Sequence, residues 1–292
     1  MTSITVSDIE VAATPAQLID HDLHRATSVS GPSPASQKDG VSPCISLYQL
    51  TSGTAFDSRC RHSLLLSTAD TSRNPLFHQA CVYVPEHDEL WVTSDLLQTT
   101  TSSSLPIVLI SRVKLRRRSR PGGRGHGGDD EDAIGDSDDD VVALEWQKLR
   151  PPQSLAMPAG GTRYGGGGMV FCAQGSLAEG TGGLYLMPRG KPPEALVTGF
   201  FGRDFNSPYD VAPARDGALW FTDPCRGSDL EFRRKPVLPC RVYRFHPESE
   251  DLRVMADGLV RPTGIAFSSD ESTAYITDTG ASKGGGDAES LQ

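Results

Sequence analysis

Short apolar runs separated by polar turn residues make up most of the chain after residue 76. Residues 80–84 and 90–94 are two such runs, and the residues between them, 85–89, have the composition of a turn. The sequence therefore predicts a β-hairpin here. No segment of helix length has an apolar period near 3.6 residues, so the chain is predicted to be mostly antiparallel β. The later predicted strands are residues 107–113, 141–148, 169–173, 184–187, 209–212, 219–222, 241–246, 252–256, 265–267 and 274–277.

Three of the predicted hairpins resemble one another in the order of their residue types. They span residues 79–95, 209–223 and 263–278. Each has a first strand, a polar turn, and a second strand with an aromatic residue in its first half and a Thr or Ser before a final Asp. A weaker fourth copy runs from residue 168 to residue 187. The repetition indicates one structural unit used several times along the chain.

The spacing of the copies predicts a β-propeller. Tyr209 and Thr263, the first residues of two copies, are 54 residues apart, close to the roughly 40 to 50 residues of a four-stranded blade. A β-sandwich with chance similarity between its hairpins is the alternative, but it does not explain the shared ending, in which an aromatic residue is followed by Thr or Ser and then Asp. The innermost strand of each propeller blade lines a central channel. We therefore expect Gln79, Tyr209 and Thr263 to face one shared axial site.

Composition divides the chain into four parts. Residues 1–42 are rich in Ser, Thr, Ala and Pro and are predicted to be a flexible extension. Residues 43–280 are predicted to hold the propeller, and residues 281–292 a flexible tail. Residues 112–140 join a basic run to an acidic run through glycines, which predicts a disordered, solvated insertion. A partner-binding or nucleic-acid-binding role for the basic run is the alternative, although the adjacent acidic run would neutralise it.

Charge and thiol content narrow the possible functions. The net charge is −9, and because the two charged runs nearly cancel, the remaining chain is mildly acidic, which argues against nucleic-acid binding. No apolar stretch approaches the roughly 20 residues that cross a bilayer, and residues 1–8 do not resemble an export signal, so a cytoplasmic chain with reduced thiols is expected. A disulfide between Cys225 and Cys240 stays open. Cys81 is expected to pack in the core.

Four segments resemble the senescence marker protein/gluconolactonase/luciferin-regenerating-enzyme family, and its fungal lactonohydrolases in particular. They keep the family's order and approximate spacing between residues 77 and 280. The resemblance implies a six-bladed propeller, one divalent cation in the tunnel, usually Ca²⁺, with Zn²⁺ or Mn²⁺ as alternatives, and hydrolysis of small-molecule lactones. The four segments are residues 77–83, 203–211, 219–224 and 261–267.

The resemblance also assigns candidate metal ligands, and this chain differs at each of them. The family's Glu and two Asn ligands correspond to Gln79, Tyr209 and Thr263, and a fourth ligand, an Asp, has no counterpart. A dication prefers oxygen ligands that include carboxylates. Losing one buried charge partner costs about 3 to 5 kcal/mol. Metal binding is therefore expected to be weak or absent.

Four further residues complete the predicted site. Asp210 is the candidate catalytic carboxylate, and His78 is a candidate general base at the tunnel mouth, with a structural role for His78 as the alternative. Arg203 and Asn206 are candidate substrate-binding residues. The resemblance thus implies a lactone hydrolase with an impaired site, and a non-catalytic propeller remnant that acts as a binding module is the alternative.

Chain length limits the expected propeller. Without the extension and the charged insertion, about 220 residues remain, enough for four or five blades of roughly 40 to 50 residues rather than six. A truncated, open propeller is therefore expected. Its unpaired strand edges would favour self-association.

Overall fold

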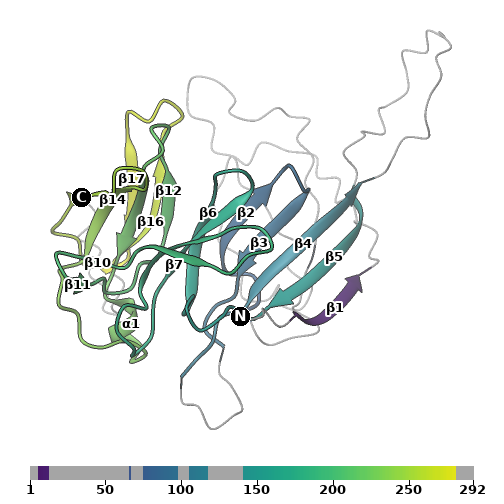
Figure 1. The fold of residues 1–292 in the computed structure, drawn as a ribbon, viewed down its shortest axis with the longest axis horizontal. Helices are drawn as coiled ribbons and strands as arrows, with labels where there is room; N and C mark the ends of the chain where they lie inside the picture. The colour runs from purple at the N-terminus through teal and green to yellow at the C-terminus, as the bar shows by residue number, and fades with distance from the viewer. Residues whose placement is uncertain (1–5, 13–65, 67–74, 98–104, 118–140, 281–292) are drawn as a thin grey trace, which may run out of the picture.

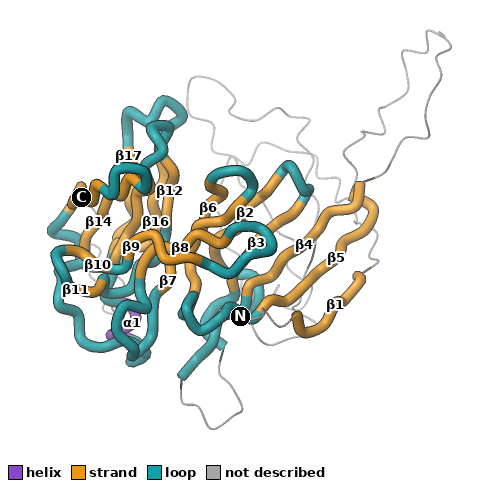
Figure 2. Tube along the Cα trace, viewed as in Figure 1, coloured by secondary structure: helices purple, strands orange, loops and turns teal. Residues whose placement is uncertain are grey.

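The computed structural model describes residues 6–12, 66, 75–97, 105–117 and 141–280. Within these ranges the chain forms a series of antiparallel sheets placed side by side, and its one helix is the four-residue α1 (Arg226–Asp229) (Figure 1). Strands and loops account for nearly all of the described chain (Figure 2). The predicted all-β fold is confirmed. No helix in these ranges has the length and apolar character needed to span a membrane.

The first sheet has five strands in the order β1-β5-β4-β3-β2. β1 lies inside the predicted N-terminal extension and pairs with β5, so residues 6–12 are not a loose segment. The rest of residues 1–42 and the tail at 281–292 lie outside the described residues. The strands of this sheet are β1 (Val6–Ala12), β2 (Gln79–Val84), β3 (Glu89–Thr93), β4 (Ile110–Arg117) and β5 (Val141–Leu149).

The second and third sheets each have four strands in chain order, which is the arrangement of a propeller blade. A two-stranded fourth sheet follows them, and a short ribbon lies between the second and third sheets. The second sheet contains β6 (Pro158–Tyr164), β7 (Gly168–Ala173), β8 (Gly183–Met187) and β9 (Glu194–Val197). The third contains β12 (Val211–Pro213), β13 (Leu219–Asp223), β14 (Arg241–His246) and β15 (Asp251–Ala256). The ribbon is β10 (Gly199–Phe200) with β11 (Arg203–Asp204), and the fourth sheet is β16 (Pro262–Phe267) with β17 (Ala274–Asp278).

Apolar side chains fill the space between successive sheets. Phe171 of β7 packs with Trp91 and Ile110 of the first sheet. Val170, its neighbour in β7, points to the opposite face and packs with Phe221 of the third sheet. Because alternate residues of a strand face opposite sides, β7 is buried along its whole length between two sheets. The described residues thus form three complete sheets and one further hairpin of the propeller series.

The Asp that ends the second and third repeated hairpins fixes the loop before an inner strand. The backbone amides of Asn206 and Ser207 donate to the carboxylate of Asp223 at 3.0 and 2.7 Å. Two amides just before β16 donate to Asp278 at 2.8 and 2.6 Å. In both copies the carboxylate fixes the loop that leads into the inner strand. In these two copies the final Asp therefore positions the segment that enters the inner strand.

The structure corrects the position of the fourth repeat copy. The copy at residues 168–187 corresponds to β7 and β8, which are the second and third strands of their sheet. The equivalent of the other three hairpins is β6 with β7. The sequence does not predict β6 because this strand contains Gly160 and Gly161, which have low strand propensity.

Two local predictions were also wrong. Residues 112–117 of the predicted insertion belong to β4, where Arg112 lies 5.9 Å from the ring of Trp91; residues 118–140 lie outside the described residues. Cys81 is exposed and not in the core. Ala80 and Cys81 have φ angles of 65° and 50°, and the pairing of β2 with β3 shifts register here, so the simple alternation of faces fails at this bulge.

Candidate functional site

A cavity of about 680 Å³ lies where the inner strands of the four sheets meet. We call it the axial cavity. The repeat-based prediction placed Gln79, Tyr209 and Thr263 at one shared site, and all three line this cavity. Its other lining residues are His78, Ala80, Asp95, Gly160, Asp210, Arg226, Gly264 and Thr279.

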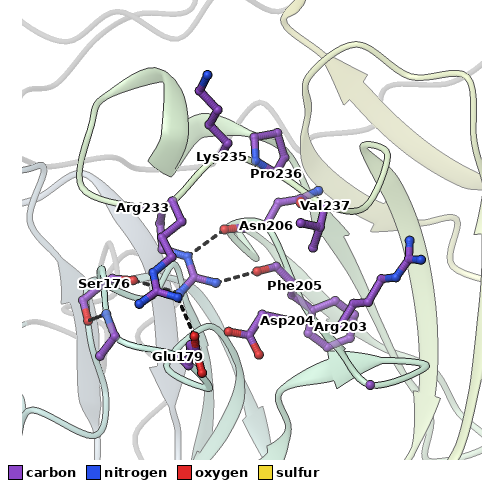
Figure 3. A pocket seen from close by; sticks show the side chains of 13 residues that line it. Ser176, Glu179, Arg203, Asp204, Phe205, Asn206, Arg233, Lys235, Pro236 and Val237 are labelled. Carbon is purple, nitrogen blue, oxygen red and sulfur yellow. Dashed lines mark hydrogen bonds and ion pairs between the residues drawn. The ribbon is translucent and has the colours of Figure 1, made fainter.

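The structure divides the predicted site residues between two cavities. Gln79, Tyr209 and Thr263 share the axial cavity with the two candidate catalytic residues, Asp210 and His78. Arg203 and Asn206, the candidate substrate-binding residues, line a separate cavity of about 670 Å³ (Figure 3). The Asn206 amide donates to the carbonyl of Leu238 at 3.0 Å. The structure thus does not bring these two residues into the axial cavity.

Asp210 is held rigidly at the axial cavity. Its carboxylate Oδ2 accepts a hydrogen bond from the backbone amide of Ile265 at 3.1 Å, and its own backbone amide donates to Thr222 Oγ1 at 3.1 Å. Burial raises the pKa of the Asp210 carboxyl, although backbone amides that donate to it partly offset this effect. A carboxylate with a raised pKa is a stronger base than an exposed one.

Gly160 leaves the room that Asp210 occupies. Its backbone amide donates to the carbonyl oxygen of Tyr209 at 2.7 Å, so β6 and the Tyr209 segment lie against each other. A Cβ atom at position 160 would lie 2.6 Å from that oxygen and in contact with Asp210 Oδ1. Only a residue without a side chain permits this close approach.

A positively charged side chain, that of Arg226, also lies at the axial cavity. The guanidinium carbon of Arg226 lies 5.3 Å from the centre of the Tyr209 ring. An Arg226 nitrogen lies 3.6 Å from Asp95 Oδ1, and His78 Nε2 lies 3.9 Å from the same oxygen. Burial raises the pKa of the Tyr209 hydroxyl, so the phenol is neutral at physiological pH.

The residues at the three aligned ligand positions do not fit a hard dication. Gln79 and Thr263 are neutral, and the Thr263 hydroxyl is within hydrogen-bond distance of Thr277, at 3.3 Å from its carbonyl oxygen and 3.1 Å from its Oγ1. Tyr209 is a neutral phenol stacked against the positive charge of Arg226. Ca²⁺ sites use oxygen ligands with carboxylates among them. Among the described residues, no group of three His, Cys, Asp or Glu side chains is arranged to hold a metal ion.

Six residues that line the axial cavity were not predicted as site residues, and three of them, Asp95, Gly160 and Arg226, determine its charge and shape. A signal existed for Asp95, because it is the final Asp of the first repeat copy. Its carboxylate accepts the amide of the next residue, Leu96, at 2.8 Å instead of fixing an inner-strand loop, and it faces Arg226. Arg226 follows the Thr-Asp ending of the second copy by only three residues. Gly160 was not predicted because its strand, β6, was not predicted.

Comparisons with known proteins agree with this architecture. Residues 141–283 match the model of the SMP-30/Gluconolactonase/LRE-like region. This region is thus similar to the SMP-30/gluconolactonase/LRE-like family, and the resemblance seen in the sequence is confirmed. The matched residues include Gly160, Tyr209, Asp210, Arg226 and Thr263 of the axial cavity.

Two curated relatives match parts of the chain. Lactonohydrolase oryL of Aspergillus oryzae is 33% identical over 149 residues, which cover 49% of this chain and 34% of the relative. The gluconolactonase of Zymomonas mobilis is 31% identical over 134 residues, which cover 42% of this chain and 36% of the relative. The chain thus spans about a third of the length of these relatives. A solved gluconolactonase from Xanthomonas campestris has 25% sequence identity and a TM-score of 0.47, with 71% of this chain and 58% of that chain covered.

Proposed function

We propose that this chain is a gluconolactonase-type lactone hydrolase whose axial cavity binds the lactone, with an impaired site and little dependence on a divalent cation. The family supports the reaction type. The observation that carries the proposal is that Asp210 and Arg226, a half-buried carboxylate and a guanidinium, line the same cavity. Ester hydrolysis needs a base for the attacking water and a positive group for the oxyanion.

In this proposal each charged residue has one role. Asp210 accepts a proton from water as the water oxygen attacks the lactone carbonyl carbon. Arg226 stabilises the negative charge that develops on the carbonyl oxygen. The ring C–O bond then breaks, and His78 at the cavity mouth gives a proton to the departing alkoxide. The product is the open-chain hydroxy acid. The raised pKa of Asp210 supports its role as the base.

Lactone turnover with and without cations tests the proposal. Hydrolysis of glucono-δ-lactone is followed by pH-stat in the presence of EDTA and then with Ca²⁺, Zn²⁺ or Mn²⁺. We expect a rate above that of the buffer with EDTA, and at most a few-fold increase with any cation. The proposal is wrong if turnover equals the buffer rate under every condition. The cation-independent part is wrong if activity appears only when a cation is added.

Single substitutions test whether lactone turnover depends on the axial cavity. Asp210→Asn is expected to lower the rate by about 10²- to 10⁴-fold, the usual contribution of a general base. Arg226→Gln is also expected to lower the rate of hydrolysis. Arg226→Lys is expected to retain part of that rate because the positive charge is kept. Asp257→Asn is the matched control, since Asp257 is an exposed aspartate outside the cavity. Equal rates for Asp210→Asn and Asp257→Asn would rule out the assigned base.

A second candidate function is lactone binding without turnover. It is favoured by the neutral side chains at Gln79, Tyr209 and Thr263, because they leave the cavity without the charges that a hydrolytic metal needs. The triple variant Gln79→Glu, Tyr209→Asn, Thr263→Asn tests it. If the native chain binds the lactone without opening it, and the variant gains neither calcium binding nor turnover, the binding module is the better description.

A further inference from the structure

The second cavity is a separate feature of the molecule. It has a volume of about 670 Å³, within the usual range for small-molecule sites. Three loops form it: the β7–β8 loop at residues 176–179, the segment 202–206, and residues 233–237 after α1. Figure 3 shows Arg233 on one side of this space and Arg203 on the other. None of its lining residues lines the axial cavity.

Positive charge is concentrated at this cavity. Its lining includes four cations, Arg203, Arg233, Arg234 and Lys235, against two carboxylates, Glu179 and Asp204. The whole chain carries a net charge of −9, so the surplus of positive charge at this cavity is opposite in sign to the charge of the chain as a whole. A concave site lined by one sign of charge raises the local concentration of ligands of the opposite sign.

Arg233 is the buried cation of the cavity. Only 9% of the surface of Arg233 is exposed to solvent. Its guanidinium donates to the carbonyl oxygens of Ser176, Phe205 and Asn206 at 2.9, 2.5 and 2.9 Å, and to Thr181 Oγ1 at 3.1 Å. All four acceptors are neutral, and no carboxylate within the described part of the chain forms an ion pair with it. Its hydrogen bonds are therefore satisfied while its charge is not neutralised by direct contact.

The other cations leave donors available at the cavity rim. Arg203 and Lys235 are exposed, and neither side chain has a hydrogen bond or ion pair to any described residue. Arg234 forms an ion pair with Glu179, but both side chains are largely exposed, at 65% and 77%. Such exposed pairs contribute little and exchange readily with other partners. Guanidinium groups bind carboxylates and phosphates through paired N–H···O contacts.

We propose that this second cavity binds a small organic oxyanion, a carboxylate or a phosphate ester, through Arg203 and Lys235 above the buried charge of Arg233. Arg233 sets the positive potential and anchors the three loops, and the two rim residues contact the ligand. The cavity is joined to the axial cavity by one segment, residues 203–210, in which Asn206 faces the second cavity and Asp210 the axial one. The inference does not require that the axial cavity hydrolyses lactones.

Calorimetric titration of the full chain at low ionic strength tests the proposal. The probes are gluconate, glucose 6-phosphate and, as the neutral control, glucose. We expect at least one anion to bind, with affinity that falls as salt rises, and glucose not to bind. Binding of gluconate alone identifies a carboxylate ligand, and binding of glucose 6-phosphate alone identifies a phosphate. Absence of binding by both anions, or equal binding by glucose, would overturn the proposal.

Two double variants locate the binding site. Arg203→Gln with Lys235→Gln is expected to weaken anion binding at least tenfold. Lys191→Gln with Arg253→Gln removes the same charge from exposed positions outside both cavities and is expected to leave affinity within twofold. Equal losses in the two variants would show only a nonspecific charge effect and would refute the site. Arg233 itself is left unchanged because it anchors the fold locally.

Asp210→Asn separates this inference from the proposed lactone hydrolysis. The variant is expected to lose turnover but to keep anion binding at the second cavity. If Asp210→Asn changes anion affinity as strongly as the double variant at Arg203 and Lys235 does, the anion occupies the axial cavity and the second site is refuted. If the native chain binds anions but opens no lactone, only the proposed function fails.

Discussion

The carboxylic acid of Asp223 is fully buried, with 0% of the residue exposed to solvent. Burial raises the pKa of Asp223 from its ordinary 3.8 to about 7, although the amides of Asn206 and Ser207 donate to the carboxylate and oppose this shift. In the folded chain the acid therefore holds its proton at pH values where the unfolded chain has lost it. The protonated acid costs little to bury, whereas the buried charge is expensive.

This shift makes folding stability depend on pH in a defined direction. Because the folded pKa lies above the unfolded one, the contribution of Asp223 to stability is fully present below about pH 4 and is lost as pH rises to about 7. We expect the urea midpoint to fall across this window in the native chain. In Asp223→Asn the fall should be smaller, although the variant is less stable throughout because one amide loses its acceptor. Parallel curves for the native chain, Asp223→Asn and the control Asp257→Asn would contradict this assignment.

Gly160 determines whether the axial cavity keeps its shape. In Gly160→Ala the new methyl group would contact Asp210 Oδ1 and lie 2.6 Å from the Tyr209 carbonyl oxygen, so the backbone must move. We expect a loss of about 1 to 3 kcal/mol in the free energy of unfolding, as in other overpacked sites. Denaturant unfolding measures this loss, and lactone turnover should fall with it.

Gly168→Ala is the matched control for this substitution. Gly168 begins β7, the strand that pairs with β6, and a Cβ atom there would come no closer than 3.2 Å to another atom. It is expected to cost less than Gly160→Ala and to leave turnover unchanged. Equal effects of the two substitutions would mean that the close approach to Asp210 is not what limits position 160.

At the level of the element, the loop between β13 and β14 contributes side chains to both cavities. Arg226 reaches the axial cavity and Arg233 reaches the second one. The loop is closed at its base by Cys225 and Cys240, whose sulfur atoms lie 2.9 Å apart with both thiols free. A single contact between thiols thus joins the two ends of the loop that carries both arginines.

The paired thiols predict unequal reactivity. A hydrogen bond from Cys225 lowers the pKa of Cys240 to about 7, whereas burial raises the pKa of Cys172. Cys240 should therefore be alkylated by iodoacetamide at pH 7, with Cys172 unreacted, as measured by peptide mass spectrometry. In Cys225→Ala the rate profile of Cys240 should shift to higher pH. If Cys240 and the exposed Cys81 show the same pH profile in the native chain, the thiol contact does not tune Cys240.

Strands were predictable from sequence where the apolar pattern is strong. The predicted strand at 241–246 coincides with β14, and the predicted runs in the first and third sheets overlap the observed strands to within a few residues. β6 was not predicted because Gly160 has low strand propensity, and a glycine is present there because Asp210 occupies the space of a side chain. Cys81 was misplaced because the bulge in β2 breaks the alternation of faces. Both errors arise where tertiary contacts override the local pattern.

At the scale of the whole molecule, the repeat predicted the convergence of strands on an axis. The first residues of three copies, Gln79, Tyr209 and Thr263, do meet at one cavity because inner strands occupy equivalent places in successive sheets. The second cavity was not predictable in this way. It is formed by loops of different lengths, and the residues that give it charge, such as Arg233 and Lys235, belong to no repeat. A repeat specifies strands and their order, whereas cavities between loops depend on the particular sequence of each loop.

The last sheet predicts how the whole chain associates. β17 pairs with β16, and no other described strand pairs with its second edge. Most of its residues are exposed, and Tyr275 is 61% exposed. Unpaired strand edges with apolar side chains recruit other strands.

We expect the 292-residue chain to self-associate through β17, with a mass by light scattering that rises with protein concentration. Tyr275→Lys should weaken this association because charge on an edge strand opposes pairing. Val260→Lys adds the same charge at a residue that is 66% exposed and lies outside β17, so its association should match that of the native chain. A constant monomer mass, or equal effects of the two substitutions, would show that β17 is not the contact.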